Sequence, residues 1–107
     1  MNASIKDLLK IEGVHGYALV DSKGALIKLP SKHRLCDSKA FFTGLRRQLI
    51  EESDRPGSVV EIYLEDMILT AFLARSTMLT TVSSRRTNLA LLRMTGKLVA
   101  ANLSKDR

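Results

Sequence analysis

The amino-acid sequence predicts an α+β fold, in which helices pack on an antiparallel sheet. The apolar residues alternate between helical and strand spacing, in the order helix, two strands, helix, three strands, helix. The connections between strands are short enough to be hairpins, which make neighbouring strands antiparallel. Hydrophobic residues make up 45% of the 107 residues and charged residues 26%, which is typical of globular domains.

The first predicted element is a short helix over about residues 3–12. Ser4 followed by Asp7 resembles a capping box in which Asp replaces the usual Glu. Gly13 suits the position just past the end of a helix, because glycine adopts a positive φ without steric cost.

Residues 13–24 form a nearly uncharged run that closes on an Asp and Gly turn, in which the Asp side chain is expected to bond the backbone. Within this run, residues 14–20 are predicted to be the central strand of the sheet, because neither face carries a formal charge when histidine is neutral. Small Gly16 and Ala18 are expected to let a helix approach this strand closely. The turn then leads into a return strand over residues 25–29.

Asp37 is expected to cap a second helix that ends near Glu52. The apolar residues of this helix span about half of its circumference, whereas one sheet face usually requires a stripe of about 100°. The excess predicts a second packing surface. These apolar residues are Phe41, Phe42, Leu45, Leu49 and Ile50.

A break at residues 54–57 precedes three further predicted strands. Residues 59–64 and 67–73 are predicted to pair as a hairpin, and residues 78–83 to form the fifth strand. The five strands make an antiparallel sheet, and three helices are enough to cover its two faces.

The last helix is predicted to start at Thr87 or Asn88 and to reach about residue 104. Gly96 lies in its apolar stripe, where glycine lowers helix propensity. Close contact between the helix and the sheet is the expected compensation.

The sequence shows no catalytic constellation, so no enzymatic activity, cofactor or metal is expected. His33, Cys36 and Asp37 are the only cluster of metal-capable side chains, but a zinc site needs about four ligands and His15 is expected to be distant. Cys36 as a nucleophile would need an activating base, and His33 has no evident third partner. Exposed loop residues are the preferred interpretation.

The chain is basic, with seventeen Lys and Arg residues against eleven Asp and Glu residues and a net charge of +6. This balance favours acidic partners, and a basic nucleic-acid-binding module is the alternative function. Only 5% of the residues are aromatic, so the stacking platform for single-stranded nucleic acid is missing and nucleic acid is not the expected partner. The apolar runs are too short for a membrane span, and the lone Cys36 allows no internal disulfide, so a cytoplasmic location is expected.

The chain resembles the roadblock/dynein light chain family from Leu8 to Leu103. The first motif that carries the resemblance is Ile11-Glu12-Gly13-Val14-x-Gly16-x-Ala18-Leu19-Val20-Asp21-x-x-Gly24. The second is Asn88-Leu89-Ala90-Leu91-Leu92-Arg93-Met94, together with Val99-Ala100-Ala101-Asn102-Leu103. The sequence departs from the family at Tyr17, where a small residue is usual, and at Phe41 and Phe42, since the middle helix is usually rich in Ala.

The resemblance implies one roadblock-like domain over residues 1–107, with the middle helix on one face of a five-stranded sheet and the terminal helices on the other. Family members usually dimerise by joining their third strands edge to edge and by packing their middle helices together. The wide apolar arc of the second helix and the open edge of the third strand favour the same symmetric homodimer. The expected dimer interface consists of Phe41, Phe42, Leu45, Leu49, Val59, Glu61 and Tyr63.

The resemblance also implies a function, namely a non-catalytic scaffold or adaptor that binds and regulates a small Ras-like GTPase or assembles a signalling or motor complex. Arg46, Arg47 and Gln48, on the less apolar side of the second helix, are the expected partner contacts. A solvated helix face is the alternative interpretation of these three residues. A small-molecule sensor with a pocket between sheet and helix is a further alternative, although the predicted inner faces offer few polar groups.

Overall fold

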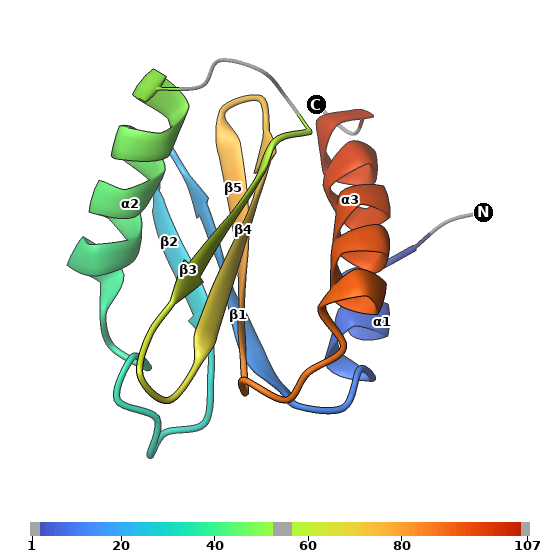
Figure 1. Ribbon diagram of the computed structural model, residues 1–107. Helices are drawn as coiled ribbons and strands as arrows, with labels where there is room; N and C mark the ends of the chain where they lie inside the picture. The colour runs from blue at the N-terminus through green and yellow to red at the C-terminus, as the bar shows by residue number, and fades with distance from the viewer. Residues whose placement is uncertain (1–2, 53–56, 106–107) are drawn as a thin grey trace.

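The structure is a computed structural model that describes residues 3–52 and 57–105 (Figure 1). Its elements follow one another in the order that the sequence predicts. They are α1 (Ile5–Leu9), β1 (Val14–Asp21), β2 (Gly24–Lys28), α2 (Lys39–Glu52), β3 (Val59–Tyr63), β4 (Ile68–Ala74), β5 (Thr77–Ser83) and α3 (Leu89–Lys105). Residues 54–56 of the expected break lie outside the described residues. In the described part of the chain, no helix is both long and apolar enough to span a lipid bilayer.

The five strands form one antiparallel sheet in the order β2-β1-β5-β4-β3. β1 is therefore an interior strand but not the central one, so the prediction for residues 14–20 is wrong on this point. The central strand is β5, which pairs with β1 on one side and with β4 on the other. Every residue of β4 and β5 is buried. Strands without an exposed face are stable where both faces are covered, which places this hairpin in the middle of the molecule.

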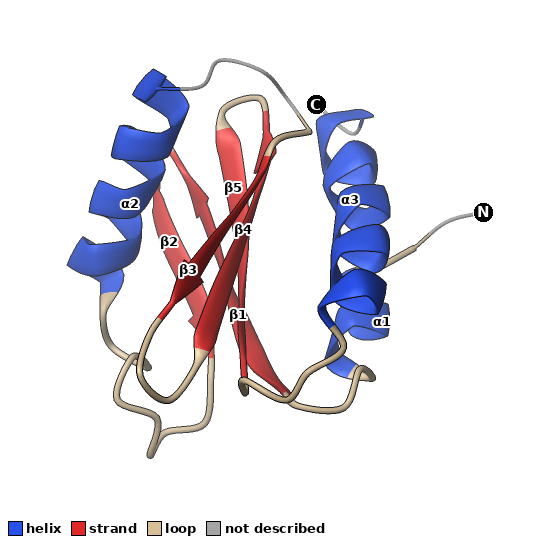
Figure 2. Cartoon of the chain, viewed as in Figure 1, coloured by secondary structure: helices blue, strands red, loops and turns tan. Residues whose placement is uncertain are grey.

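Helix α2 covers one face of the sheet, and α1 and α3 cover the other, as the resemblance implied (Figures 1 and 2). On the α2 side, Phe42 packs into a buried cluster with Leu69 of β4. On the other side, Leu92 of α3 packs into a second cluster with Phe72 of β4. Helix α2 lies closest to β1 and β2, whereas α3 lies closest to β4. The two helix layers are therefore offset from each other across the sheet.

The first helix is shorter than the sequence predicts, because regular helical bonding ends at Leu9. The carboxylate of Asp7 accepts a hydrogen bond from the backbone N–H of Ser4 at 2.8 Å, which is one half of the expected capping box. Beyond the helix, two successive turns follow, in which the N–H of Ile11 bonds the carbonyl of Leu8 and the N–H of Val14 bonds the carbonyl of Ile11. These turns take the place of the last helical residues that were expected.

Asp21 was expected to organise a turn and Asp37 to cap a helix, and the two expectations have different outcomes. Asp21 Oδ1 accepts hydrogen bonds from the backbone N–H groups of Lys23 at 2.8 Å and Gly24 at 3.1 Å, which confirms the predicted turn between β1 and β2. Helix α2 begins at Lys39, two residues after the predicted cap Asp37. The loop before it is instead organised by short-range backbone bonds, such as that from Cys36 N–H to the carbonyl of His33.

Two glycines mark places where other groups come too close for a side chain. A Cβ on Gly96 of α3 would collide with the ring of Phe72, which confirms the predicted close contact between helix and sheet. A Cβ on Gly16 of β1 would collide with the carbonyl oxygen of Lys28. The close approach at Gly16 is therefore made by the end of β2 and not by a helix.

Candidate functional site

Strand β3 forms one edge of the sheet and is the first part of the candidate site. It pairs with β4 on one side, and no strand of the described chain pairs with its other side. Val60 and Ile62 of β3 pack with the cluster on the α2 side, whereas Val59 packs with the cluster on the α3 side. All three are only half-buried. An edge strand with half-buried apolar side chains on both faces is suited to pairing with another strand.

Helix α2 forms the second part of the candidate site. Leu45 and Leu49 are half-buried against the α2-side cluster, and Phe41 is 43% exposed. Phe42 is fully buried beside the sheet, with its ring 5.2 Å from the ring of Phe41 in an edge-on arrangement. The side chain of Phe42 therefore belongs to the core of the chain and offers no surface to a second copy. The sequence could not separate these neighbours, because the predicted apolar arc included both.

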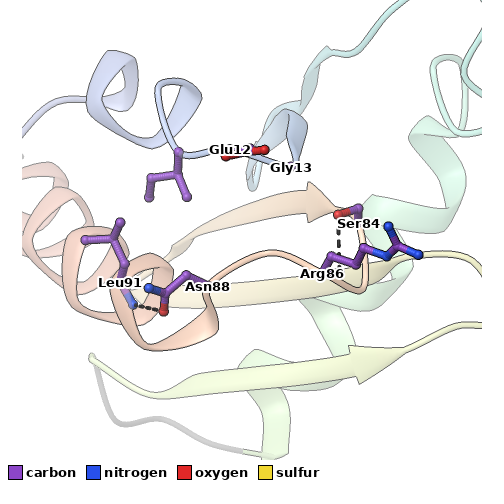
Figure 3. A pocket seen from close by; sticks show the side chains of 7 residues that line it. Glu12, Gly13, Ser84, Arg86, Asn88 and Leu91 are labelled. Carbon is purple, nitrogen blue, oxygen red and sulfur yellow. Dashed lines mark hydrogen bonds between the residues drawn. The ribbon is translucent and has the colours of Figure 1, made fainter.

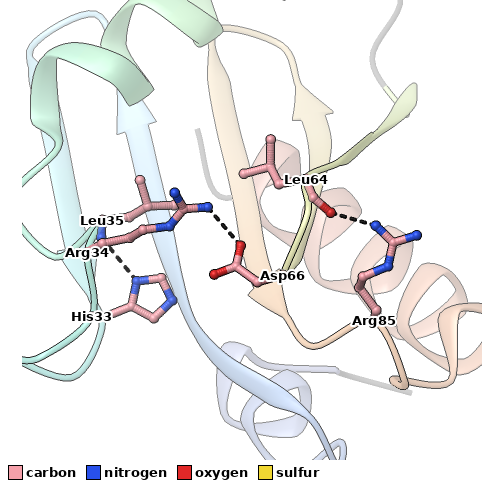
Figure 4. Close-up of polar contacts among 6 residues, drawn as sticks. All are labelled: His33, Arg34, Leu35, Leu64, Asp66 and Arg85. Atoms are coloured by element: carbon pink, nitrogen blue, oxygen red, sulfur yellow. Dashed lines mark hydrogen bonds and ion pairs between the residues drawn. The ribbon is translucent and has the colours of Figure 1, made fainter.

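Polar contacts occupy the α3 side of β3. The carboxylate of Glu61 accepts a hydrogen bond from Arg93 Nε of α3 at 2.6 Å and another from the hydroxyl of Tyr63 at 3.2 Å. The guanidinium of Arg85 lies 5.9 Å from the centroid of the Tyr63 ring and donates to the carbonyl of Leu64 at 2.6 Å (Figure 4). Tyr63 remains 54% exposed. Glu61 therefore ties β3 to α3, while the Tyr63 side chain stays accessible.

The three residues expected to contact a partner do not form a uniform surface. Arg46 is half-buried, and its Nε donates to the carbonyl of Ser76 in the turn between β4 and β5 at 2.7 Å. Arg47 and Gln48 are exposed on α2. Arg46 therefore fastens α2 to that turn, whereas the other two side chains are free to meet a partner.

Two histidines come together where the sequence placed them apart. The rings of His15 in β1 and His33 in the loop before α2 are 5.6 Å apart, which corrects the expectation that His15 is distant. Nδ1 of His33 accepts a hydrogen bond from the N–H of Leu35 at 3.1 Å (Figure 4). Burial lowers the pKa of His33, and the neighbouring His15 and Arg34 lower this pKa further, while Asp66 opposes them.

The predicted cluster around Cys36 gains no further ligand from this arrangement. Cys36 Sγ donates to the carbonyl of Ser31 at 3.4 Å, and it is half-buried. Within residues 3–52 and 57–105, the acidic, histidine and cysteine side chains form no group of three that would hold a metal ion.

Several basic residues are engaged within the chain, which bears on the nucleic-acid alternative. Arg34 pairs with Asp66 at 2.8 Å and Arg93 pairs with Glu61 at 2.6 Å. The guanidinium groups of Arg46 and Arg85 bond backbone carbonyls. In each case a phosphate would have to compete with the contact that the guanidinium group already makes within the chain, which weighs against a basic groove for a nucleic-acid backbone.

A hollow of about 490 Å³ lies at one end of the α1 and α3 layer (Figure 3). It is lined by the α1–β1 connection, the β5–α3 connection and the first turn of α3. Its walls include Glu12, Ser84 and Leu91. The hollow is thus bounded by connections at the end of the layer, and not by the inner faces of sheet and helix that the sensor alternative requires.

Two features of the site could not be predicted from the sequence. Val60 and Ile62 face α2 and are only half-buried, although the expected interface contains the opposite face of the strand. The strict alternation of side chains along the strand was visible, but which face would lie toward α2 was not. The contact between His15 and His33 was missed because it depends on the path of a loop.

Comparisons with known proteins bear on the fold. Neither a protein-family model nor a curated protein matches the chain. Among solved structures, the Roadblock/LC7 domain from Streptomyces avermitilis superposes with a TM-score of 0.68 at 17% sequence identity, over 94% of this chain and 92% of that one. The chain has the roadblock/LC7 fold.

Two further solved structures resemble this roadblock fold. The gliding protein mglB from Thermus thermophilus has a TM-score of 0.71 at 18% identity, and the match covers 94% of this chain and 83% of that one. MglC from Myxococcus xanthus has a TM-score of 0.61 at 16% identity, over 95% of this chain and 94% of that one. The antiparallel sheet with three helices in the order α-β-β-α-β-β-β-α is the arrangement expected for this fold.

Proposed function

We propose that this roadblock-fold chain is a non-catalytic dimeric scaffold, which binds and regulates a small Ras-like GTPase or assembles a signalling or motor complex as an adaptor. The observation that carries the proposal is the open edge of β3, with Val60 and Ile62 half-buried beside it. Such an edge exposes unpaired backbone groups, and pairing with the same edge of a second copy hides them. In this proposal, residues 1–107 form one domain, and the chain acts in the cytoplasm.

The proposed dimer seam combines β3 with the partly exposed flank of α2. Because α2 lies closest to β1 and β2, the α2 side of β3 keeps apolar surface that a second copy would cover. Phe41, Leu45 and Leu49 supply further apolar surface from α2. Gly44 supports this assignment, because a Cβ there would meet nothing within 4 Å, so the glycine has no packing role inside the chain. Val59, Glu61 and Tyr63 border the seam on the α3 side, while Phe42 is left out of it.

The partner part of the proposal is supported by the two sequence motifs and by the likeness to mglB and MglC, which together favour a regulator or adaptor. Arg47 and Gln48 are the proposed partner contacts, because their side chains are exposed on α2. Arg46 contributes by fixing the helix to the turn at Ser76. The surplus of positive charge favours a partner with an acidic surface.

The dimer is tested by light scattering at micromolar concentration with a pair of edge variants. Ile62→Lys places a charge on the β3 edge, so we expect it to convert the dimer to a monomer. Leu26→Lys is the matched control, because Leu26 is 49% exposed on β2, the other edge of the sheet, and this variant should remain a dimer. A wild-type protein that is monomeric, or an Ile62→Lys variant that is folded and still dimeric, rules out the seam.

The partner is tested by capture of small GTPases from the same genome, each loaded with GDP or with a GTP analogue. We expect at least one to bind in a nucleotide-dependent manner and Arg47→Glu to weaken that binding about tenfold. Lys23→Glu, in the exposed turn between β1 and β2, is the control for the general loss of positive charge. Capture that is independent of nucleotide with every GTPase argues against regulation of a GTPase cycle.

A further inference from the structure

Helix α3 exposes an apolar stripe on the side that faces away from the sheet. Leu91, Met94 and Leu98 are 40%, 60% and 43% exposed, and their spacing of three and four residues places them on one face of the helix. Leu92 and Val99, which hold α3 on the sheet, are buried. The three exposed residues, hereafter the α3 stripe, therefore contribute little to the core. Single exposed leucines are common, but three in helical register on one helix indicate a surface that another molecule covers.

Unpaired cations border the α3 stripe. Lys97 follows Met94 by one helical turn, and Arg86 lies just before the helix, where it lines the hollow together with Leu91. Neither side chain has an ion-pair partner among the residues that the structure describes. Arg93 on the same helix differs, because it is bound to Glu61 of β3. Lys10, exposed at the end of the neighbouring helix α1, adds a further cation without a partner in the described chain.

The α3 stripe runs into the hollow at its N-terminal end. Leu91 belongs to both, and it points from α3 toward the connection between α1 and β1, where Ile11 completes the apolar wall (Figure 3). The side-chain oxygen of Asn88 accepts a hydrogen bond from the N–H of Leu91 at 3.1 Å, which fixes the start of the helix. Glu12 adds one negative charge to the wall. The hollow of about 490 Å³ is large enough to receive an apolar side chain of a binding segment.

We propose that the α3 stripe is a docking site for an amphipathic helical segment of another protein, with Leu-type residues on one face and Asp or Glu residues beside them. The apolar face would lie on Leu91, Met94 and Leu98, and one large apolar side chain would enter the hollow. The acidic residues would pair with Lys97 and Arg86. Met94, the most exposed of the three, is flexible and adapts its shape to the segment.

The charges and the size of the surface favour this occupant over a second copy of the chain. A twofold pairing of α3 with α3 of a second copy would bring Lys97 of both copies to the same flank, where like charges repel. Three partly exposed side chains also fall well short of the ~800 Å² per partner that a stable interface buries. The side chain of a peptide can enter the hollow while its helix lies on the stripe, which matches the continuity of the two through Leu91. A short acidic helix can pair with Lys97 and Arg86, and it can also place an apolar side chain in the hollow.

This docking site lies on the opposite side of the sheet from α2 (Figure 1). A segment bound to α3 would leave the exposed side of α2 free. The chain would therefore hold two partners at once, one on each helix layer. The inference extends the proposed adaptor function, but it does not depend on the dimer or on a GTPase.

The test uses the full chain and a fluorescein-labelled helical peptide of about 18 residues, with Leu on one face and Glu and Ala elsewhere. Fluorescence anisotropy should show saturable binding that weakens as salt is added. Met94→Glu and Lys97→Glu should each weaken binding about tenfold. Both substitutions are at exposed positions, and melting curves verify that the variants are folded. Leu26→Glu and Lys28→Glu on β2 are the matched apolar and basic controls, and they should bind the peptide like the wild type.

Several outcomes overturn the inference. Absence of saturable binding, or equal weakening by the β2 controls, shows that the peptide recognises no site on α3. Binding of a peptide with the same composition but scrambled Leu positions shows attraction by net charge alone. Binding of phosphatidylserine vesicles that Met94→Glu abolishes, without peptide binding, assigns the surface to a membrane. Light scattering that shows a smaller assembly for Met94→Glu assigns it to a second copy, and this readout separates failure here from failure of the β3 seam.

Discussion

The two sides of the sheet differ in where they leave apolar surface uncovered. On the α2 side the uncovered surface lies within the layer itself, at half-buried residues such as Val60 and Ile62 beside an open strand edge. On the α1 and α3 side, Tyr17, Leu19 and Val59 are also half-buried within the layer, but this side differs because α3 carries an exposed apolar stripe on its outside. The sheet and helix of a second copy can cover apolar surface beside a strand edge. A short helical segment is enough to cover an apolar stripe on the outside of one helix.

The largest expected effect comes from removing a core side chain on the α2 side of the sheet. Phe42→Ala removes a fully buried ring, and we expect it to lower the free energy of unfolding by about 3–5 kcal/mol. Chemical denaturation measures this loss. Phe41→Ala, at the neighbouring exposed ring, should cost less than about 1 kcal/mol in the monomer. Equal costs would show that α2 does not distinguish a core side from an outer side.

Two glycines test how closely α2 and α3 pack against the rest of the chain. Gly96→Ala inserts a methyl group where the Phe72 ring already lies, so we expect a loss of stability of about 1–3 kcal/mol. Gly44→Ala on α2 meets nothing within 4 Å, so its better helix propensity should raise the stability of the monomer by up to about 1 kcal/mol. Thermal unfolding should show a lower melting temperature for Gly96→Ala and a higher one for Gly44→Ala. A destabilising Gly44→Ala would mean that α2 is packed more tightly than the structure shows.

The two ion pairs are expected to have smaller effects on the free energy of unfolding. One joins α3 to β3, and the other joins the loop before α2 to the turn between β3 and β4. Glu61→Gln removes a charge that bonds both Arg93 and Tyr63, and we expect a loss of about 1 kcal/mol. Asp66→Asn breaks a pair in which both side chains are more than half exposed, so the loss should be near zero. Urea unfolding compares the two variants. Equal losses would contradict the stronger attachment of β3 to α3.

The smallest expected effect is the dependence of stability on pH at the loop before α2. The pKa of His33 is lowered in the folded state, mainly by burial, so the unfolded chain binds its proton more readily. The stabilisation is present above the unfolded pKa of about 6.5 and is lost as the pH falls through the folded pKa. His33→Asn retains an acceptor for the N–H of Leu35 but does not titrate in this range.

The readout for His33 is the melting temperature at pH 7.5 and at pH 5.5. The wild type should lose slightly more on acidification than His33→Asn does. The melting temperature of His15→Gln should also fall less on acidification than that of the wild type, because the substitution removes a positive charge beside His33. An acid loss that is the same in all three proteins would place the sensitive group elsewhere.

The order and type of the elements could be predicted from the sequence, because apolar spacing and turn residues are local signals. The turn at Asp21 and the close contact at Gly96 are confirmed for that reason. The length of α1, the start of α2 and the central position of β5 could not be predicted. Helix ends respond to competing turns of similar energy, and strand order depends on contacts between distant residues.

Much less of the candidate site was predictable. The apolar arc of α2, which includes Phe41, Phe42 and Leu49, was recognised from its helical spacing, but the sequence did not show that Phe42 is fully buried in the core. Leu91 and Met94 of the α3 stripe were part of a motif that carries the family resemblance, yet the exposure of Leu91, Met94 and Leu98 was not inferred. Periodicity identifies apolar faces, but the fraction of each face that the sheet covers depends on how the layers are offset.

The class of fold and the order of five strands and three helices can be read from the amino-acid sequence, which also contains no recognisable catalytic motif. These properties follow from short-range patterns that every segment carries. Three features depend on tertiary packing instead, namely the central position of β5, the placement of α2 over β1 and β2, and the contact between His15 and His33. These outcomes depend on how segments far apart in the chain share one sheet, and that is settled by the packing of the whole core.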